Sequence, residues 1–208
     1  FTPDTNTLLG EVPEVRNLFS CCGLNSIGIG SGGGVGKVTA EWMMKGHINE
    51  DLFIYDIKRF EKLHSKINFI KKRVTETLGD LYGMHWPYKQ HKTSRNQKKL
   101  PYHEELKSAG ACFGVVAGYE RPMWFSLKGK TAEYEYSYNY QNWYPSVEYE
   151  TTNTRKNVGL FDLTPFAKFE LKGQHSHSEL QRICTANIKN EKGRTTYTQM
   201  LNKDGGIE

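Results

Sequence analysis

The most distinctive stretch of the sequence is a glycine run between residues 21 and 37. It reads CCGLNSIGIGSGGGVGK, with glycines at positions 23, 28, 30, 32, 33, 34 and 36. Glycine has no Cβ atom, so such a run lets the backbone approach another group closely. That approach is needed to bind a nucleotide phosphate, a dinucleotide or a flat ring such as a flavin. Close packing of two protein elements needs it as well.

One phosphate-binding pattern can be tested directly on this run. A P-loop reads G-x-x-x-x-G-K-[ST], and its backbone amides and lysine surround the phosphates. If Gly36 and Lys37 ended such a loop, position 31 would have to be glycine and position 38 serine or threonine. The chain has Ser31 and Val38 there. The sequence therefore excludes a P-loop.

The dinucleotide fingerprint G-x-G-x-x-G fits the run better. Gly28, Gly30 and Gly33 match it, and Asp51 follows about 20 residues later, where an acidic residue would bind the ribose. However, a run so rich in glycine offers several accidental matches, and the further strands of a doubly wound sheet are not recognisable. A backbone wall against a flat cofactor needs the same absence of Cβ atoms. The residues alone leave both interpretations open.

Two histidine clusters lack the pattern of a metal site. His175 and His177 could both be ligands on a strand, but no third ligand lies at a suitable spacing, and we interpret them as a solvated helix start. His103 and Glu104 begin HEEL, which lacks the second histidine of the zinc motif H-E-x-x-H. We therefore predict no metal site.

The composition is that of a folded protein. Of the 208 residues 37% are apolar and 12% aromatic, which is enough for a core. The formal charge of +5 includes a basic segment at 89–99, which we interpret as a solvated face rather than a nucleic-acid-binding surface. No run of about 18 apolar residues occurs, so no membrane span is expected. The cysteines have no metal or disulfide spacing and indicate reduced, buried thiols: Cys21, Cys22, Cys112 and Cys184.

Short apolar segments flank the glycine run. Residues 18–22 (LFSCC) have the composition of a strand, and LFIYDI at 52–57 is a second strand-like run. From Val35 the apolar residues recur at helical spacing, and Lys45 followed by Gly46 is a helix stop. The glycines are therefore expected between a strand and a helix.

One long amphipathic helix is predicted over residues 60–81. Its apolar residues step by three or four throughout: Phe60, Leu63, Ile67, Ile70, Val74, Leu78 and Leu81. Lysines lie off this stripe, so we expect a packing helix with one buried face. Residues 83–96 are polar and irregular, and we expect a connection there.

A second unit follows this connection. LPYHEELKSAGACFG (100–114) predicts a turn, a helix and a glycine-bounded strand, and EYEYSYNYQNWYP (133–145) predicts an exposed strand or an aromatic loop. GLFDLTPFAKFELKG (159–173) alternates as a strand does, and SELQRIC (178–184) predicts a helix with Ser178 as its cap. The predicted fold class is therefore α/β to α+β.

Two blocks of the sequence resemble one protein family. FTPDT, LLGEVPEVRNLFSCCGLNSIGIGSGGGVGKVTAEWMMKG and DLFIYDIKRF resemble the end of the flavin domain in the sarcosine and dimethylglycine dehydrogenase family. PYHEELKSAGACFG, AGYERPMWF, GLFDLTPFAKFELKG and TTYTQMLNKDGGI resemble the start of the glycine-cleavage T-protein, a folate-binding aminomethyltransferase fold. That family fuses the two modules in this order, and the resemblance covers nearly the whole chain.

The resemblance implies three parts of a two-module protein. Residues 1–58 would be the C-terminal part of an FAD-dependent oxidoreductase domain, and 59–99 a central connecting domain. Residues 100–208 would be the N-terminal part of the aminomethyltransferase, T-protein-like fold. The flavin-linking and principal substrate-binding residues of the family lie upstream of Phe1. We therefore expect a fragment that by itself neither holds FAD firmly nor oxidises sarcosine.

The resemblance also distinguishes branches within the family. YDIKRF, SRN, HEEL and GYERPMWF most resemble the branch that oxidises sarcosine, and the branch that oxidises dimethylglycine comes second. The regulatory subunit of pyruvate dehydrogenase phosphatase shares the architecture and the FTPDT opening, but it is not known as a dehydrogenase. It is a non-enzyme alternative, and a small self-contained binding protein is another.

The resemblance implies that the glycine run lines a flavin. In the family, the isoalloxazine ring lies along the segment that matches Leu24, Asn25, Ser26, Ile27, Gly28 and Ile29. The next helix points its N-terminus at the pyrimidine edge, where reduced flavin accumulates negative charge. Unpaired N–H groups and the positive end of a helix dipole stabilise an anion there. We expect the amides of residues 31–35 to supply these groups.

The implied reaction is oxidation of an N-methyl amine by hydride transfer to FAD, which gives an imine. Tetrahydrofolate then takes the one-carbon unit as methylene-tetrahydrofolate, or water releases it as formaldehyde. The implied partners are sarcosine or dimethylglycine as the small-molecule substrate and an electron-transfer flavoprotein as the electron acceptor. The family also implies the mitochondrial matrix, and nucleic acid is not expected as a partner.

The resemblance assigns two residues to folate. Tyr197 matches a tyrosine of the folate pocket, and Phe166 stands where that family commonly has a pocket methionine, which departs from the pattern. Without the resemblance, Tyr197 would equally be a strand tyrosine packed on a sheet. The catalytic aspartate of the folate module would follow Glu208 by two residues. No catalytic residue is therefore assigned within the chain.

Overall fold

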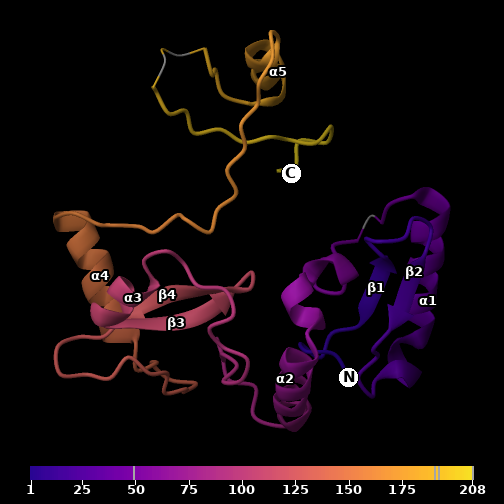
Figure 1. The fold of residues 1–208 in the computed structure, drawn as a ribbon, viewed down its shortest axis with the longest axis horizontal. Coiled ribbons are helices and arrows are strands. Elements are labelled where there is room, and N and C mark those ends of the chain that lie inside the picture. The colour runs from indigo at the N-terminus through magenta and orange to yellow at the C-terminus, as the bar shows by residue number, and fades with distance from the viewer. Residues whose placement is uncertain (49, 190, 192, 208) are drawn as a thin grey trace. The chain divides into compact units, whose positions relative to one another are not determined.

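The computed structural model describes residues 1–48, 50–189, 191 and 193–207 (Figure 1). The chain forms two compact units, Phe1–Pro165 and Phe166–Glu208. The first unit contains, in order, β1 (Leu8–Glu11), β2 (Phe19–Cys22), α1 (Gly28–Lys45), α2 (Ile67–Asp80), α3 (His103–Ser108), β3 (Ala111–Val116), β4 (Tyr119–Phe125) and α4 (Tyr144–Lys156). This mixture of helices and short strands confirms the predicted fold class.

β1 and β2 form a two-stranded antiparallel sheet, and α1 packs against it (Figure 1). Leu9 lies opposite Cys21 in the register of the two strands. The ring of Trp42, from α1, lies edge to face with Phe19 at 6.2 Å. It also covers Gly10, where an added Cβ would be 2.5 Å from the indole ring. The strand predicted around Phe19 is therefore confirmed, and a large aromatic side chain joins it to the helix.

α1 is longer than the sequence predicts. Helical spacing of apolar residues begins at Val35, but the helix begins at Gly28, so most of the glycines lie inside it. The pattern missed this half because glycine has no side chain to mark a face. The end is as predicted, since Gly46 takes the left-handed conformation (φ 75°) directly after Lys45. Neither α1 nor any other helix in the described part of the chain is long and apolar enough to cross a membrane.

The strand predicted at 52–57 does not form. The amide of Tyr55 donates to the carbonyl of Leu52 (2.8 Å), which closes a turn. Asp56 then caps the short 3-10 helix η1 (Ile57–Arg59). The segment pairs with β1 at a single parallel bridge, where the amide of Leu9 donates to the carbonyl of Tyr55 at 2.9 Å. The turn bonds and an aspartate that can cap favour the turn over a longer strand.

The helix predicted at 60–81 forms over a shorter range. The chain makes a 3-10 helix, η2 (Lys62–Ser65), and then α2 (Ile67–Asp80). The two are separate because Lys66 between them is extended (φ −67°, ψ 126°). At the start of η2, Glu61 and His64 form a reciprocal cap, in which Nδ1 of His64 accepts from the amide of Glu61 at 3.0 Å. Burial lowers the pKa of His64, which keeps the imidazole neutral and able to accept this bond.

The buried face of α2 differs from the predicted apolar stripe. Its buried residues are Phe69, Arg73 and Thr77, whereas Ile67 and Leu78 of the stripe are 61% and 42% exposed. Arg73 donates to a carbonyl of the following connection, and the hydroxyl of Thr77 donates to the carbonyl of Arg73 (3.0 Å). These hydrogen bonds compensate for the burial of polar side chains on this face of α2. The spacing of apolar residues cannot predict such a buried polar face.

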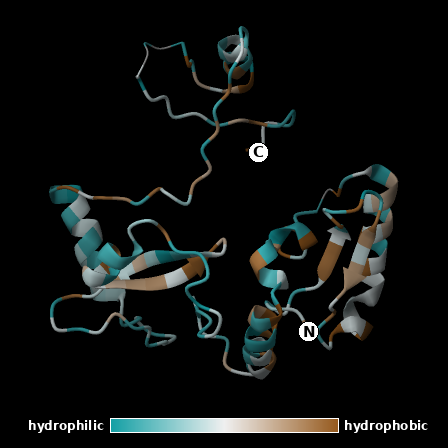
Figure 2. Ribbon diagram, in the orientation of Figure 1, coloured by the Kyte–Doolittle hydropathy of each residue, from teal (hydrophilic) through white to brown (hydrophobic). Residues whose placement is uncertain are grey.

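β3 and β4 form a second antiparallel hairpin. The sequence predicted the first of these two strands, β3. Val116 lies opposite Tyr119, and the two turn residues Ala117 and Gly118 both have positive φ (49° and 78°), which suits a twisted two-residue turn. Figure 2 shows hydrophobic colours along β3, whereas α4 is mostly hydrophilic. The buried apolar side chains here are Leu100, Ala111, Cys112 and Trp124.

The aromatic segment 133–145 is a loop that leads into α4, which is one of its two predicted forms. Tyr134 stacks on Tyr136 with ring centroids 5.7 Å apart and an angle of 6°. It also meets Trp124 of β4 and Trp143 edge to face, at 6.0 and 5.1 Å. Aromatic contacts of this kind hold the loop against the hairpin without a strand ladder.

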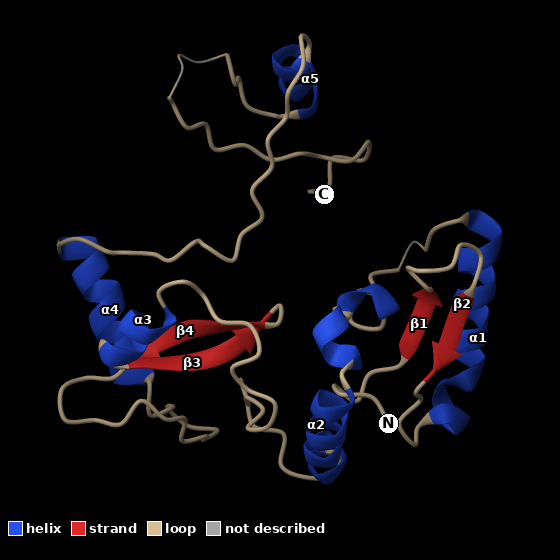
Figure 3. Cartoon of the chain, viewed as in Figure 1, coloured by secondary structure: helices blue, strands red, loops and turns tan. Residues whose placement is uncertain are grey.

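The second unit contains α5 (Ser176–Ile183), and its other described residues are drawn as loop (Figure 3). α5 confirms the helix predicted at 178–184, but Ser178 is not its cap. The N-cap is His175, and the hydroxyl of Ser178 donates to its carbonyl at 2.8 Å. The segment 159–173 is described throughout and forms no strand, so that prediction is wrong; alternation alone gives no strand without a neighbour to pair with.

The cysteines differ in exposure. All four are free; Cys112 is buried, Cys184 is half-buried, and Cys21 and Cys22 on β2 are exposed. The expectation of buried thiols is therefore confirmed for Cys112 and wrong for the β2 pair, because no neighbouring element buries these two side chains in the described part of the chain. Burial raises the pKa of the Cys112 thiol to about 11, so it stays protonated at neutral pH.

Candidate functional site

The six residues expected beside a cofactor form the connection from β2 to α1 and the start of α1. Gly23, Asn25 and Ser26 all have positive φ (67°, 47° and 70°), so the chain turns sharply before the helix. The helix then begins at Gly28, where an added Cβ would lie 3.1 Å from Cδ1 of Leu24. A side chain at Gly28 would therefore crowd the Leu24 side chain, which would have to shift slightly.

The side chains of this segment face different ways. Ser26 and Ile29 are exposed, and Ile27 is 59% exposed. Asn25 is only 6% exposed, because its amide is turned towards Thr2. A ligand lying over this segment would therefore meet backbone and the exposed side chains. It would not meet the side-chain amide of Asn25, although the resemblance places Asn25 among the contact residues.

The unpaired amides lie earlier in the chain than expected. Because α1 begins at Gly28, the amides of 31–35 belong to the helical ladder, starting with the 3.0 Å bond donated by Ser31. The first amides of a helix have no acceptor within it, and here they belong to Gly28, Ile29 and Gly30. The first turn, which is fully described, carries no acidic residue, so the positive end of the dipole remains available to an anion.

From its first turn onwards, α1 presents bare backbone. At five positions an added Cβ would meet no described atom within 4 Å; these positions, which we call the glycine wall, are Gly30, Gly32, Gly33, Gly34 and Gly36. Glycine costs a helix about 1 kcal/mol relative to alanine. Nothing in the described chain requires this cost, since no residue of α1 is buried. Gly30, Gly33 and Gly34 are three and four residues apart and so lie on one side of the helix, and this side of the wall has room for a flat group close to the backbone.

The dinucleotide fingerprint does not form a Rossmann turn. In that fold the first glycine closes the turn between a parallel strand and a helix. Here Gly28, Gly30 and Gly33 all lie inside α1, and β2 pairs antiparallel with β1. Asp51, which matched the ribose-binding position, is exposed and accepts from the amide of Phe53 (3.4 Å). The fingerprint match is therefore accidental.

A buried ion pair stands beside a cavity of the hairpin region. Glu120 is 2% exposed and accepts from Nε and an NH2 group of Arg95 at 2.8 and 2.5 Å, and from the amide of Asn96 at 2.6 Å. Burial raises the pKa of Glu120, but these bonds outweigh it and hold that pKa below its usual range. The hydrogen bond to Glu120 raises the pKa of Arg95. Both groups therefore stay charged.

The cavity beside this pair has a volume of about 790 Å³, a size typical of small-molecule sites. His103 lines it, is 4% exposed, and has a buried Nδ1 without a hydrogen-bond partner among the described residues. Burial lowers the pKa of His103, so the ring is neutral at pH 7. Burial also raises the pKa of two further lining groups, Cys112 and Tyr134, which remain protonated. Neither of these two groups is therefore an ionised nucleophile at neutral pH.

A carboxylate and histidine cluster on α2 was missed by the sequence analysis. Ligand atoms of Glu76, Asp80 and His91 lie within 4.8 Å of one another, a spacing that could hold a metal ion. However, Glu76 accepts from the amide of Thr93 (2.8 Å), and Asp80 is paired with Lys89 (2.7 Å). These oxygens anchor the connecting segment to α2. The i, i+4 spacing of Glu76 and Asp80 on α2 could be recognised in the sequence, but only the fold brings His91 to them.

The two residues assigned to folate lie in the second unit. Tyr197 is 87% exposed and Phe166 is 58% exposed. Tyr197 lies in irregular chain, so it is not packed on a sheet as the alternative interpretation required. Their assignment stays a prediction based on resemblance.

Similarity to known proteins covers both parts of the chain. Residues 102–208 match the GCVT N-terminal domain, and residues 45–99 match the FAD dependent oxidoreductase central domain. The whole chain is 43% identical to the 4-methylaminobutanoate oxidase (formaldehyde-forming) of Paenarthrobacter nicotinovorans, of which it covers 25%. It is 33% identical to the mitochondrial sarcosine dehydrogenase of Homo sapiens, again over the whole chain and 25% of that protein. The chain belongs to the sarcosine/dimethylglycine dehydrogenase-like FAD oxidoreductases that carry a GCVT domain.

This dehydrogenase-like family also contains other activities. The mitochondrial pyruvate dehydrogenase phosphatase regulatory subunit of Mus musculus is 32% identical over the whole chain, which covers 24% of it, and dimethylglycine dehydrogenases are relatives too. These matches confirm the predicted order, in which sequence of an FAD-dependent oxidoreductase is followed by a GCVT domain. They also confirm that the relatives belong to an FAD-dependent oxidoreductase family. The chain spans about a quarter of the length of these curated relatives.

Proposed function

We propose that the chain is part of a flavin-dependent enzyme that removes the methyl group of an N-methyl amino acid. The observation that carries this proposal is the whole-chain similarity to two enzymes named for such substrates, at 43% and 33% identity. Residues 1–58 would close the FAD-dependent oxidoreductase domain, 59–99 would connect, and 100–208 would begin the folate-binding domain.

The connection from β2 to α1 fits FAD. The glycine wall leaves room for a flat ring, and the first amides of α1 with no acidic neighbour suit negative charge on the pyrimidine edge. FAD held there would supply the two-electron acceptor for the hydride of the N-methyl carbon. The segment beside the ring would be Leu24, Asn25, Ser26, Ile27, Gly28 and Ile29, with Asn25 contributing its backbone.

Sarcosine is the proposed substrate, and dimethylglycine and 4-methylaminobutanoate are the alternatives taken from the names of the relatives. The N-methyl carbon gives up a hydride and the nitrogen of the secondary amine a proton, which leaves an imine. Water then releases formaldehyde, or tetrahydrofolate bound near Tyr197 and Phe166 takes the carbon as methylene-tetrahydrofolate. An electron-transfer flavoprotein is the proposed acceptor, and the mitochondrial matrix the proposed compartment.

A non-catalytic role is the second candidate. It rests on the 32% identity to the phosphatase regulatory subunit over the whole chain. Such a protein would keep the same fold without amine oxidation.

Formaldehyde release separates these candidates. The full-length protein that contains this chain would be incubated with sarcosine, dimethylglycine or 4-methylaminobutanoate and an artificial electron acceptor. We expect formaldehyde from sarcosine in the highest yield, and less of it when tetrahydrofolate is added. A higher yield from either other amine would replace sarcosine as substrate. A folded protein that oxidises none of them would support the regulatory role.

The position of the cofactor can be tested within α1. Gly30→Ala and Gly36→Ala both place a methyl group where no described atom lies within 4 Å, and both should stabilise the helix. If the start of α1 faces the flavin, Gly30→Ala alone should weaken flavin retention several-fold. Equal retention by both variants and the parent would argue against this placement.

A further inference from the structure

In the side-chain amide of Asn25, both the oxygen and the nitrogen form hydrogen bonds within the protein. Its Oδ1 accepts from the amide of Thr2 at 2.9 Å, and its Nδ2 donates to the hydroxyl of Thr2 at 3.1 Å and to the carbonyl of Gly23. With 6% exposure it is closed to a ligand. Its side chain must therefore have a role other than contact.

That role is suggested by the backbone around it. Asn25 and Ser26 are consecutive residues with φ of 47° and 70°. Asparagine tolerates this left-handed region, but a serine in it is uncommon and must be held by its surroundings. The bonds from Thr2 fix the first of the two residues, and the second then leads directly into the start of α1.

Thr2 is itself held firmly. It is 3% exposed, and its hydroxyl donates to the carbonyl of Asn6 at 2.9 Å. Thr77 of α2 donates to the carbonyl of Thr2 at 3.4 Å. The Thr2 segment is therefore fixed between α2 and the β2–α1 connection.

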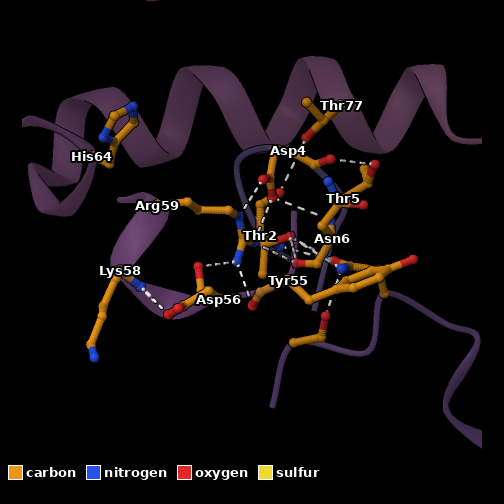
Figure 4. A network of polar contacts seen from close by, with 12 residues as sticks. Thr2, Asp4, Thr5, Asn6, Tyr55, Asp56, Lys58, Arg59, His64 and Thr77 are labelled. Carbon is orange, nitrogen blue, oxygen red and sulfur yellow. Dashed lines mark hydrogen bonds and ion pairs between the residues drawn. The ribbon is translucent and has the colours of Figure 1, made fainter. Parts of the chain in front are cut away.

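Arg59 supplies the outer anchor of this segment. Its Nε and an NH2 group donate to the two carboxylate oxygens of Asp4 at 2.8 and 3.1 Å, and it also donates to the carbonyl of Asn6 at 3.0 Å (Figure 4). The same guanidinium donates to the carbonyls of Tyr55 and Asp56. The Arg59 side chain is 9% exposed, so these bonds are shielded from water.

We propose that these residues form a positioning network for the cofactor-facing turn. The network consists of Arg59, Asp4, Asn6, Thr2 and Asn25, and it sets the direction in which residues 26–29 and the first amides of α1 point. None of its side chains touches the cofactor. The inference rests on the proposed flavin site, and it changes Asn25 from a contact residue into a positioning residue.

Thr2→Val in the full-length protein tests the network with little change of shape. Valine keeps the volume but removes the hydroxyl that Asn25 and Asn6 bond. Thr2→Ser restores the hydroxyl and is the rescue variant. Thr75→Val removes a hydroxyl bonded within the exposed face of α2 and is the matched control. Glu120→Gln loosens a buried ion pair in the hairpin and controls for lost stability.

Two readouts distinguish positioning from mere stability. Hydrogen exchange of peptides covering residues 20–30 reports the turn itself, and we expect exchange about tenfold faster in Thr2→Val, as the loss of one buried hydrogen bond implies. The reduction potential of the bound flavin should fall, because displaced amides stabilise its anionic form less. Thr2→Ser should restore both values.

The controls decide the outcome. We expect Thr75→Val and Glu120→Gln to leave both exchange at 20–30 and the flavin potential unchanged. Unchanged exchange in Thr2→Val would overturn the positioning network, and so would a potential shift that Glu120→Gln reproduces. A parent protein without any flavin would instead overturn the proposed function, and hydrogen exchange would still test the network.

Discussion

Arg95 and Glu120 form a two-point ion pair that joins the connecting segment to β4, with Glu120 almost fully buried. Charges withdrawn from water are costly unless each has its partner, so the pair must be kept or lost together. The amide of Asn96 adds a third bond to the same carboxylate. This arrangement fixes the polar connection to the hairpin of the GCVT part.

Breaking this pair should destabilise the hairpin strongly. Glu120→Ala leaves the Arg95 guanidinium without its partner, and we expect a loss of about 3 kcal/mol in the free energy of unfolding. Urea unfolding followed by tryptophan fluorescence measures it. Glu104→Ala removes an exposed pair with Lys99 and serves as the control, for which we expect no measurable change. Similar midpoints for the two variants would show that the buried pair is not critical.

Acid should weaken the fold through buried His103. Burial lowers its folded pKa below the unfolded value of about 6.5, so the unfolded chain binds protons more readily in that window. This contribution to stability is present above about pH 6.5 and is lost as the pH falls towards the lower folded pKa. His103→Phe should flatten the fall in unfolding free energy between about pH 6.5 and 5. An unchanged slope would contradict this account.

Glu120 should also lower the unfolding free energy as the pH falls, but at a lower pH than His103. Its folded pKa is depressed, so its stabilisation is present above the unfolded value of about 4.3 and disappears below it. Histidine and glutamate therefore act in the same direction, in separate pH windows.

Gly10 cannot be replaced without disturbing α1. An added Cβ would lie 2.5 Å from the Trp42 ring, and φ of 111° disfavours any side chain. We expect Gly10→Ala to cost about 2 kcal/mol or more in unfolding free energy. Gly46→Ala is the matched control, because φ is positive there but no described atom lies within 4 Å; it should cost about 1 kcal/mol. Equal losses would mean that the tryptophan moves aside freely.

If Tyr197 belongs to a folate pocket, its loss should change the product of the reaction and not the rate of amine oxidation. In the full-length protein, Tyr197→Ala should lower methylene-tetrahydrofolate formation and raise free formaldehyde, while amine oxidation stays unchanged. Tyr138→Ala, in the exposed aromatic loop, is the control. Equal product ratios in both variants would remove Tyr197 from the folate pocket.

Local signals predicted those elements whose ends are marked by glycine. The helix stop at Gly46 and the β3 strand after Gly110 both follow from left-handed glycines at element boundaries. Apolar runs without such marks misled, since 52–57 closes a turn through its own backbone. In 159–173 the alternation has no neighbouring strand to pair with.

Neither the buried face of α2 nor the positioning network could be predicted from the sequence, because both depend on hydrogen bonds between residues far apart in the chain. Arg73 is buried because a carbonyl of the connecting segment accepts from it, and Asn25 is buried because Thr2 bonds both sides of its amide. Such partners lie far along the chain, as Arg59 and Asp4 do, and no spacing rule links them. The glycine run, by contrast, could be recognised because its missing side chains are visible in the sequence itself.

The most direct measurement is the visible absorption of the full-length protein during anaerobic titration with sarcosine. If the chain belongs to a flavin-dependent demethylating enzyme, the protein carries a flavin absorption band, and substrate bleaches it in proportion to the amount added. Dimethylglycine and 4-methylaminobutanoate titrated in parallel rank the substrates. A folded protein that shows no flavin band, or a band that none of the three amines bleaches, would contradict the account.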